Sequence, residues 1–584
     1  MGSLSVEASA EAKNGNGAGY HYAHGALREP RPIRVVMIGA GVSGIGAVKL
    51  FKERFANQPV TLKIYEKNSD VGGTWFENRY PGCSCDVPAH GYTYTWEGNP
   101  NWSQAYVSSR ELFDYYKGRA VAYGVFDHLF LNHMVTGAKW EGNKGTWAIE
   151  VTDTQTGNSF TDEAEIFINA GGFLNKWRWP DIPGIEDFGG FRAHSACWDD
   201  SLDFTDKRVA VIGSGSSGIQ IVPTLEPIVK KMVTVIRSPV WITPEIAADL
   251  APEGRDTVYT EEQKKKWAED PQEFLRFRKI IERSMNHLYE IHFKGSDMQR
   301  KMTDTFTRLM KDRLKNKPEL ADRLIPKFGV GCRRQVLLTP GKGYLEALCS
   351  DKVEVAFGSV ARITKSGLVM QDGTTYEVDA IICATGFDTS FKPRFPLIGS
   401  KGTDLRDIWK KEPASYLSVT IPDFPNYFVI GGPNFTLANG VFLICLETTF
   451  KYVFQAIEKI QQEGIKSVVP KREAMNDFLE HKDSIMNDMV WTSTCRSWYK
   501  NGTVDGKVWG IWPGSSIHFI EIMAAPRWED YDIEYLQKNR FNFFGIGQTL
   551  REKRHGDLSY YLSERGYSYD DQEVGEGPGF LGKV

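Results

Sequence analysis

The stretch IRVVMIGAGVSGIGAVKLF, residues 33–51, decides the fold class of this chain. It begins with apolar, largely β-branched residues that predict a buried strand, and it ends in an apolar segment typical of a helix. Between them, Gly39, Gly41 and Gly44 have the spacing G-x-G-x-x-G. In this motif the first glycine permits a tight turn, the second lets a pyrophosphate approach the backbone, and the third allows close helix–strand packing. The stretch therefore predicts a dinucleotide-binding unit, with the diphosphate at the helix N-terminus.

The strand expected next indicates which dinucleotide this unit binds. VTLKIYEK, residues 60–67, carries Glu66 near its end. A carboxylate at this place accepts hydrogen bonds from ribose hydroxyls and repels a 2′-phosphate. The first unit is therefore expected to bind FAD or NAD rather than NADP.

The same pattern occurs a second time, in KRVAVIGSGSSGIQIVPTL, residues 207–225. Its three glycines are Gly213, Gly215 and Gly218. The following strand, MVTVIRS (232–238), ends in Arg237 and Ser238, so a guanidinium stands where the first unit has a carboxylate. Arginine pairs well with phosphate, and the second unit is expected to prefer NADP.

Two further apolar segments fit the same architecture. AEIFINAGG (164–172) and DAIICATGF (379–387) both predict buried strands that end in small residues, which allow a flavin or dinucleotide to come close. The second contains Thr385 and Gly386 and resembles the A-T-G-F/Y stretch of flavoproteins with two dinucleotide folds. One glycine motif alone is a weak indication, because such turns are common. Two copies, each with a suitable charge downstream, favour nucleotide binding over turns that serve only the fold.

The predicted fold is therefore α/β, with two Rossmann-like dinucleotide-binding domains and the NADP domain inserted into the FAD domain. The residues between 245 and 328 are highly charged and place apolar side chains at helical spacing, which predicts a helical insertion in the NADP domain. The expected parts are a disordered arm (1–30), the first part of the FAD domain (31–185), a linker (186–200), the NADP domain (201–378) with its helical insertion (about 245–328), and the second part of the FAD domain with a C-terminal loop and tail (379–584).

Composition excludes several function classes. The 584 residues carry a formal net charge of −4, which does not indicate a basic nucleic-acid surface. No apolar run reaches the length of a membrane span, and a cytoplasmic location is expected. The eight cysteines have no zinc-like spacing, so we expect reduced, scattered thiols and no metal site.

Two longer motifs carry a family resemblance. Between the two glycine units, FGGFRAHSACWDD has the spacing F-x-G-x-x-x-H-x-x-x-W, and GGTWFENRYPGCSCD (72–86) ends in Asp86. The fingerprint positions are Phe188, Gly190, His194 and Trp198. With these motifs the chain resembles the Baeyer–Villiger monooxygenases, from about residue 33 to about residue 540. Stretches such as CDVPAHGYTYTW resemble the sequences of fungal members.

The resemblance implies an activity. NADPH would reduce FAD, and the reduced flavin would react with O2 to a C4a-peroxyflavin that adds to a ketone carbonyl. The adduct would rearrange to an ester or lactone, with one oxygen atom in the product and the other in water. The implied substrate is a small-molecule ketone, by analogy one of secondary metabolism.

The resemblance also implies roles for individual residues. Arg334 matches the catalytic arginine, whose guanidinium stays charged beside a peroxide anion. Asp86 matches the carboxylate that orients this arginine, and Arg333 matches a position that helps to hold the NADP phosphate. Trp498 resembles a tryptophan on the loop that closes over NADP, and His194 is expected to shape the connector rather than act as a base.

The glycine motifs and the resemblance together give an expected cofactor-binding set: Gly39, Gly41, Gly44, Glu66, Gly73, Thr74, Trp75, Asp86, Gly213, Gly215, Gly218, Arg237, Ser238, Arg333, Thr385, Gly386 and Trp498. Structural alternatives stay open for some of them. Asp86 could cap a turn, the two arginines could bind phosphates or exposed carboxylates only, and Trp498 could be core packing.

Three other function classes remain as alternatives to a Baeyer–Villiger monooxygenase. A related class B flavin monooxygenase would oxygenate nitrogen or sulfur, but it carries a shorter variant of the fingerprint. A disulfide reductase needs a cysteine pair about four residues apart, and Cys83 and Cys85 do not supply it. A non-catalytic dinucleotide-sensing flavoprotein is the remaining alternative.

Overall fold

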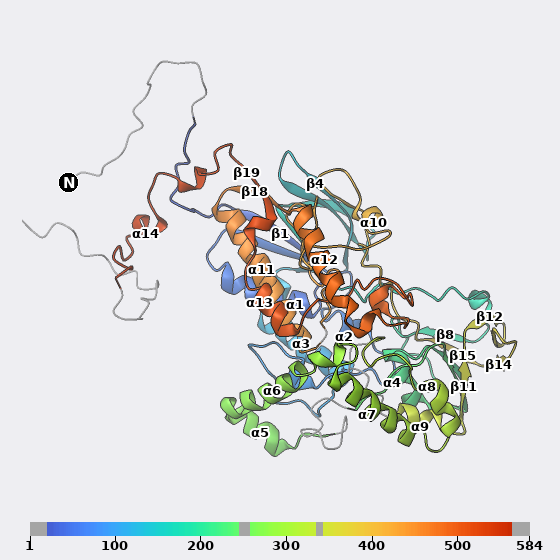
Figure 1. Ribbon diagram of the computed structural model, residues 1–584. Helices are drawn as coiled ribbons and strands as arrows, with labels where there is room; N and C mark the ends of the chain where they lie inside the picture. Colours follow the sequence, from blue (N-terminus) through green and yellow to red (C-terminus); the bar gives the residue numbers. More distant parts are fainter. Residues whose placement is uncertain (1–19, 245–256, 334–342, 438, 563–584) are drawn as a thin grey trace, which may run out of the picture. The chain divides into compact units, whose positions relative to one another are not determined.

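The computed structural model of the chain describes residues 20–244, 257–333, 343–437 and 439–562 (Figure 1). By internal contacts the chain divides into two compact units. The larger unit comprises Pro32–Ile457 and Ser467–Ile533, and it contains both glycine motifs. The smaller unit comprises Met1–Arg31, Glu458–Lys466 and Glu534–Val584.

The first sheet of the larger unit is parallel and is built around the first glycine motif. Its strand order is β17-β7-β1-β2-β3. The strands are β1 (Ile33–Ile38), β2 (Val60–Tyr65), β3 (Leu129–Phe130), β7 (Ile166–Asn169) and β17 (Tyr427–Val429). Helix α1 (Val42–Arg54) follows β1 directly across the glycine turn. The βα unit predicted from residues 33–51 is therefore confirmed.

The second sheet is also parallel, with strand order β11-β10-β9-β15-β8. Its strands are β8 (Phe191–His194), β9 (Arg208–Ile212), β10 (Lys231–Ile236), β11 (Val353–Phe357) and β15 (Ala380–Cys383), and α4 (Ser216–Leu225) follows β9. All five strands lie in the chain between β7 and β17 of the first sheet. One dinucleotide fold is thus inserted into the other, and the predicted α/β class with two Rossmann-like folds is confirmed.

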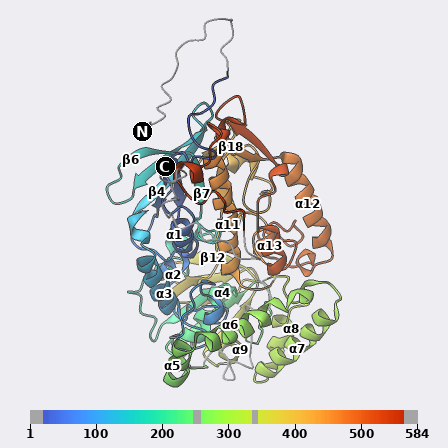
Figure 2. The same cartoon turned by 90° about the vertical axis from the view of Figure 1, so that its left-hand side faces the viewer.

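A group of helices connects β10 to β11, as the charged segment predicted. The helices are α5 (Glu261–Glu269), α6 (Pro271–Asn286), α7 (Asp297–Arg313), α8 (Ala321–Leu324) and α9 (Tyr344–Leu348), and they lie together, green to yellow, in Figures 1 and 2. The Asp270 side chain accepts hydrogen bonds from the Gln272 and Glu273 backbone N–H groups, which caps α6. Residues 245–256, part of the predicted insertion, lie outside the described residues.

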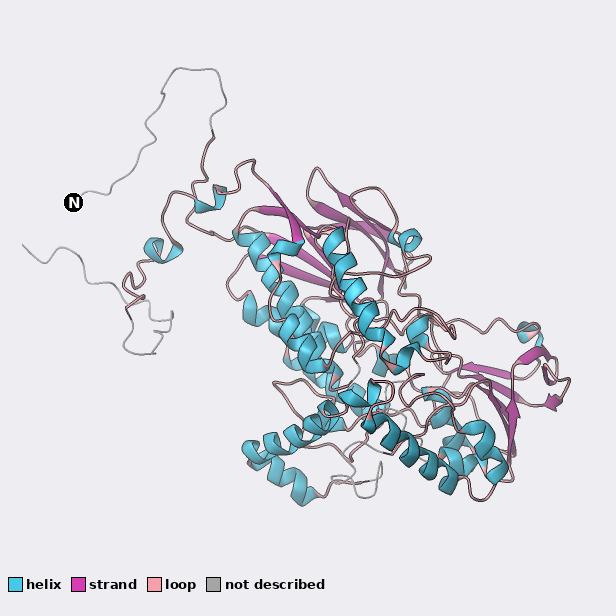
Figure 3. Cartoon of the chain, in the orientation of Figure 1, coloured by secondary structure: helices cyan, strands magenta, loops and turns pink. Residues whose placement is uncertain are grey.

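Smaller elements complete the chain, and Figure 3 shows all strands in magenta. The remaining strands are β4 (His133–Glu141), β5 (Thr146–Asp153), β6 (Ser159–Ala164), β12 (Val360–Thr364), β13 (Gly367–Met370), β14 (Thr375–Glu377), β16 (Leu397–Ile398), β18 (Ile465–Pro470) and β19 (Tyr531–Tyr535). The remaining helices are α2 (Thr74–Glu77), α3 (Ser109–Ala122), α10 (Leu405–Ile408), α11 (Phe442–Gln462), α12 (Arg472–Asn487), α13 (Ser516–Ile522) and α14 (Leu550–Lys553).

The boundary segments between the two folds differ from the sequence prediction. Within the expected linker 186–200, Phe191–His194 form β8, an edge strand that pairs in parallel with β15. The β15 segment itself lies in the second sheet between β9 and β8, although it was expected to begin the second part of the FAD domain. Both strands have four residues, and the choice of the sheet that each one joins depends on contacts with strands that are distant in the sequence.

The prediction of a disordered arm over residues 1–30 does not hold for residues 26–28, which make defined contacts. In the smaller unit, Ala26 is buried, and the backbone N–H groups of Leu27 and Arg28 donate to the carbonyls of Gln548 and Phe543. Residues 1–19 lie outside the described residues. In the part of the chain that the structure describes, no helix is both long enough and apolar enough to cross a membrane.

Candidate active site and nucleotide-binding motifs

The three glycines of the first motif differ in what surrounds them. Gly39 has φ +96°, and a Cβ there would lie 2.7 Å from the Ala170 carbonyl oxygen. A Cβ on Gly44 would lie 2.2 Å from the Gly39 carbonyl oxygen, so helix and turn require glycine. A Cβ on Gly41 would meet only Gly73, at 3.5 Å from its Cα. Packing therefore explains the outer two glycines, while the backbone at Gly41 is left open to a close approach.

Glu66 lies beside this turn and is 5% exposed. Its carboxylate accepts backbone hydrogen bonds from Ala40 at 2.8 Å and from Asn68 at 2.9 Å. Burial raises the pKa of Glu66, and the two backbone donors oppose that rise. Because each carboxylate oxygen has two lone pairs, the group can brace the turn and still accept a ribose hydroxyl.

The segment around Gly73 closes over the same turn. Gly73 has φ +51° and precedes Thr74 and Trp75 of α2. The Trp75 side chain is buried and meets the Tyr92 ring edge-on, with centroids 5.6 Å apart, and its indole N–H interacts with the Tyr92 hydroxyl. Packing among the described residues does not require glycine at position 41, which fits the close approach of a dinucleotide such as FAD.

The second motif repeats this geometry. Gly213 has φ +117°, and a Cβ there would lie 2.4 Å from the Ala384 carbonyl oxygen. A Cβ on Gly218 would lie 2.1 Å from the Gly213 carbonyl oxygen. A Cβ on Gly215 would meet no heavy atom of the described residues within 4 Å. The middle glycine is again the one that packing does not require, so this motif too fits a dinucleotide pyrophosphate.

Three of the predicted phosphate-binding residues lie beside the second motif. Ser214 of the glycine turn donates its hydroxyl to the Ser238 carbonyl at 3.2 Å, immediately after Arg237. Arg333 Nη1 donates to the carbonyls of Ser238 and Pro239, the latter at 2.7 Å. Arg237, Ser238 and Arg333 are therefore brought together. Arg334, the predicted catalytic arginine, lies outside the described residues.

Asp86 is tied to the second dinucleotide fold by a residue that the sequence reasoning missed. Gln220 of α4 donates through Nε2 to Asp86 Oδ1 at 3.3 Å and to the Ser84 carbonyl at 3.1 Å. Its own Oε1 accepts from the Tyr80 hydroxyl at 2.8 Å. The available signal was a lone amide in the otherwise apolar helix segment IQIVPTL. The motif that ends at Asp86 is thereby joined to the helix after Gly218.

His194 of the fingerprint is buried, with 1% exposure. Its Nδ1 accepts from the Ala196 backbone N–H at 3.1 Å, so Nε2 carries the proton that is donated to the Thr385 hydroxyl at 3.2 Å. The ring stacks on Trp177 with centroids 4.7 Å apart. Burial lowers the pKa of His194 to about 4, which keeps it neutral near pH 7. This geometry links β8 to the turn after β15.

The other fingerprint residues have packing roles. Phe188 and Trp198 are buried. A Cβ on Gly190 would lie 2.2 Å from the Asp379 carbonyl oxygen, which requires glycine beside β15. In the turn after β15, Gly386 has φ +84°, and an added Cβ there would meet no heavy atom of the described residues within 4 Å.

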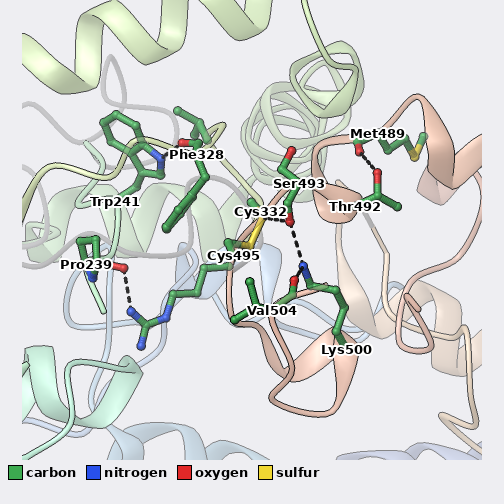
Figure 4. Close-up of a disulfide and its surroundings, with 12 residues drawn as sticks. Pro239, Trp241, Phe328, Cys332, Met489, Thr492, Ser493, Cys495, Lys500 and Val504 are labelled. Carbon is green, nitrogen blue, oxygen red and sulfur yellow. Dashed lines mark hydrogen bonds between the residues drawn. A yellow bond between two sulfur atoms is a disulfide. The ribbon is translucent and has the colours of Figure 1, made fainter. Parts of the chain in front are cut away.

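Two of the cysteines contradict the expectation of reduced thiols. Cys332 and Cys495, 163 residues apart in the sequence, form a disulfide (Figure 4). Nothing in their spacing could have predicted the pair. The bond joins the residue before Arg333 to the loop that carries Trp498. That tryptophan stacks on Phe173 with centroids 5.6 Å apart.

Comparisons with known proteins show the family of the chain. Residues 32–317 match the family model described as flavin-binding monooxygenase-like. The chain is 38% identical to the FAD-binding monooxygenase tazF of Aspergillus terreus, over 91% of this chain and 95% of that protein. It is 31% identical to a Baeyer–Villiger monooxygenase of Pseudomonas aeruginosa, over 84% of this chain and 89% of that protein.

Solved structures show the same fold. Cyclohexanone monooxygenase from Rhodococcus sp. Phi1, bound to NADP+, matches with a TM-score of 0.73 at 24% identity, over 87% of this chain and all of that one. OTEMO in complex with FAD and NADP matches with a TM-score of 0.72 at 25% identity, over 86% of this chain and 99% of that one.

Proposed function

Since this chain belongs to the flavin-binding monooxygenase-like family and is a flavoprotein monooxygenase of the Baeyer–Villiger type, we propose that it inserts one oxygen atom of O2 into a ketone to give an ester or lactone. Its cofactors are FAD and NADPH. The observation that carries the proposal is the pair of glycine motifs, each with one glycine that packing does not require.

The first motif and its neighbours are proposed to hold FAD, which supplies the oxygen-activating chemistry once NADPH has reduced it. Gly41 and Gly73, whose backbones lie against each other, are proposed to face the pyrophosphate, flanked by Gly39, Gly44 and Thr74. Glu66 is proposed to accept a ribose hydroxyl beside the turn that it braces. Trp75, which is buried against Tyr92, is proposed to line the dinucleotide site.

The second motif is proposed to hold NADPH. Gly213, Gly215 and Gly218 receive the pyrophosphate, while Arg237 and Ser238 receive the 2′-phosphate. Arg333 fastens the segment after Arg237 through two carbonyls. Thr385, Gly386 and Trp498 are proposed to border the cofactors, and His194 is proposed to position Thr385 through its Nε2–H group.

Arg334 and Asp86 are proposed as the residues that serve the oxygen transfer. A guanidinium stays charged at any working pH and stabilises negative charge that develops on the reacting oxygen atoms. Asp86 is proposed to orient it. Gln220 holds Asp86 from α4, so the carboxylate position depends on the NADPH-binding fold. This link would make the oxygenation site sensitive to how NADPH is seated.

The proposed substrate class is a small ketone of secondary metabolism, on the likeness to fungal relatives such as tazF of Aspergillus terreus and stcW of Emericella nidulans. Oxygenation of nitrogen or sulfur is the second candidate.

The test is a reaction of the FAD-loaded protein with NADPH under anaerobic conditions, followed by oxygen and a panel of ketones, amines and sulfides. We expect NADPH to bleach the flavin and at least one ketone to give an ester. Products from amines or sulfides alone would replace the proposal by the second candidate, and a flavin that NADPH does not bleach would refute both. Arg334→Ala should retain NADPH oxidation and lose the ester. Unchanged ester formation in that variant would overturn the role of Arg334.

A further inference from the structure

Two arginines carry like charges that act on each other, and one of them follows the strand after the second glycine motif. Arg237 follows β10, and Arg496 follows the disulfide cysteine Cys495. Neither guanidinium has an ion pair with a carboxylate of the described residues. Burial lowers the pKa of Arg237, and the charge of Arg496 lowers it further. Two like charges held near each other repel, and an anion between them removes that cost.

A disulfide and two hydrogen bonds connect the segments that carry Arg237 and Arg496. Arg333 Nη1 donates to the carbonyls of Ser238 and Pro239, so it lies against the segment after Arg237. The residue before it, Cys332, is bonded to Cys495. Figure 4 shows Pro239, Cys332 and Cys495 around this junction. Arg237 and Arg496 are therefore each one residue away from segments that a disulfide and two hydrogen bonds hold together.

The loop that carries Arg496 is itself well tied. Arg496 Nη1 donates to the Gly502 carbonyl at 2.5 Å. Lys500 is buried and donates through Nζ to the carbonyls of Ser493 at 2.9 Å and Val504 at 2.5 Å (Figure 4). A loop closed on its own carbonyls in this way presents Arg496 at a defined place. Among the described residues Arg496 uses one nitrogen on the loop, so its other guanidinium donors can meet an anion.

We propose that Arg496 is a second arginine for the 2′-phosphate of NADPH, opposite Arg237, and that the Cys332–Cys495 disulfide holds it there. The inference rests on the proposed use of NADPH. A ribose phosphate carries close to two negative charges near pH 7, which one arginine only partly balances. Arg496 is thus a specificity-determining residue for NADPH over NADH.

The test measures binding of adenosine 2′,5′-bisphosphate and of 5′-AMP to the FAD-loaded full chain by calorimetry. Arg496→Ala is expected to weaken the bisphosphate roughly tenfold, about 1.4 kcal/mol. Binding of 5′-AMP is expected to change less than about twofold, because it lacks the 2′-phosphate. Arg496→Lys should retain part of the preference. Arg362→Ala removes an exposed arginine of β12 and serves as the matched control.

The outcomes separate this inference from the proposed function. If the unaltered protein binds the bisphosphate no better than 5′-AMP, the proposed use of NADPH fails and the inference fails with it. If the unaltered protein prefers the bisphosphate and Arg496→Ala keeps the same preference, the role of Arg496 is overturned while the proposed function stands. Cys495→Ser should also reduce the preference, and an unchanged ratio in that variant would refute the role of the disulfide.

Discussion

Two alanine substitutions in one motif should both weaken NADPH binding, but only one of them should destabilise the fold. At Gly215, an added Cβ meets no heavy atom of the described residues within 4 Å. The cost to the fold is limited to the weaker helix capping of alanine, below about 1 kcal/mol. The methyl group would, however, occupy the space through which a pyrophosphate reaches the backbone. We expect Gly215→Ala to weaken NADPH binding at least tenfold, about 1.4 kcal/mol, by overpacking that contact.

Gly218→Ala should damage the fold instead. Its Cβ would lie 2.1 Å from the Gly213 carbonyl oxygen and 3.0 Å from the Gly213 carbonyl carbon. Both atoms are backbone, so the turn and α4 must move apart by about 1 Å, at a cost of about 1–3 kcal/mol. The unfolding temperature should fall measurably, and NADPH binding should weaken as a consequence. FAD content should stay the same in both variants, because the first motif is untouched.

The assays are a thermal melt and the dependence of anaerobic flavin reduction on NADPH concentration. Gly118→Ala is the control, since Gly118 lies in α3 with no described atom within 4 Å of the added Cβ. That variant should be about 0.5–1 kcal/mol more stable, with unchanged NADPH binding. The reasoning would be refuted by NADPH binding within about twofold of the unaltered protein in Gly215→Ala, or by full stability of Gly218→Ala.

Two further substitutions and one chemical reduction test other parts of the larger unit. His90 is buried among four aromatic rings, and burial lowers its pKa to about 3. Below about pH 6.5 the unfolded chain binds a proton at this histidine that the folded protein does not bind, so the free energy of unfolding falls, by about 2 kcal/mol at pH 5. His90→Phe should therefore lose less unfolding temperature between pH 7.5 and pH 5 than the unaltered protein does. The same loss in both proteins would contradict the proposed effect of His90. Reduction of the Cys332–Cys495 bond, which closes 163 residues, should lower the unfolding temperature by about 3 °C, and a melt unchanged by dithiothreitol would count against it. Gln220→Leu should slow ester formation about tenfold with unchanged FAD content, because Asp86 loses one of its orienting hydrogen bonds, and turnover at the normal rate would dismiss that role.

Local pattern was enough to predict much of the fold. In the turns after β1 and β9, the third glycine contacts the carbonyl of the first, five residues earlier, and the first contacts an alanine that follows an adjacent strand of the sheet. The spacing of these glycines is therefore recognisable in the sequence. The same holds for Glu66 and Arg237, each at the end of the strand after the motif. The helical insertion also showed its apolar periodicity.

Contacts between segments that are far apart in the chain could not be predicted from the sequence. Strands β8 and β15 have four residues each, and their place in the second sheet follows from pairing across almost two hundred positions. Gln220 reaches Asp86 from 134 residues away. The disulfide joins segments separated by 163 residues, and neither cysteine has a spacing that suggests a partner. Each of these features is fixed by packing of the whole larger unit rather than by local propensity.

The most direct test of the central claim is the fate of labelled oxygen. The FAD-loaded protein is supplied with NADPH, a ketone and 18O2, and the product is examined by mass spectrometry. For a Baeyer–Villiger reaction we expect an ester or lactone that contains one 18O atom, with the other labelled atom in water. NADPH consumption that yields only hydrogen peroxide across the ketone panel, or a product without the label, would contradict it.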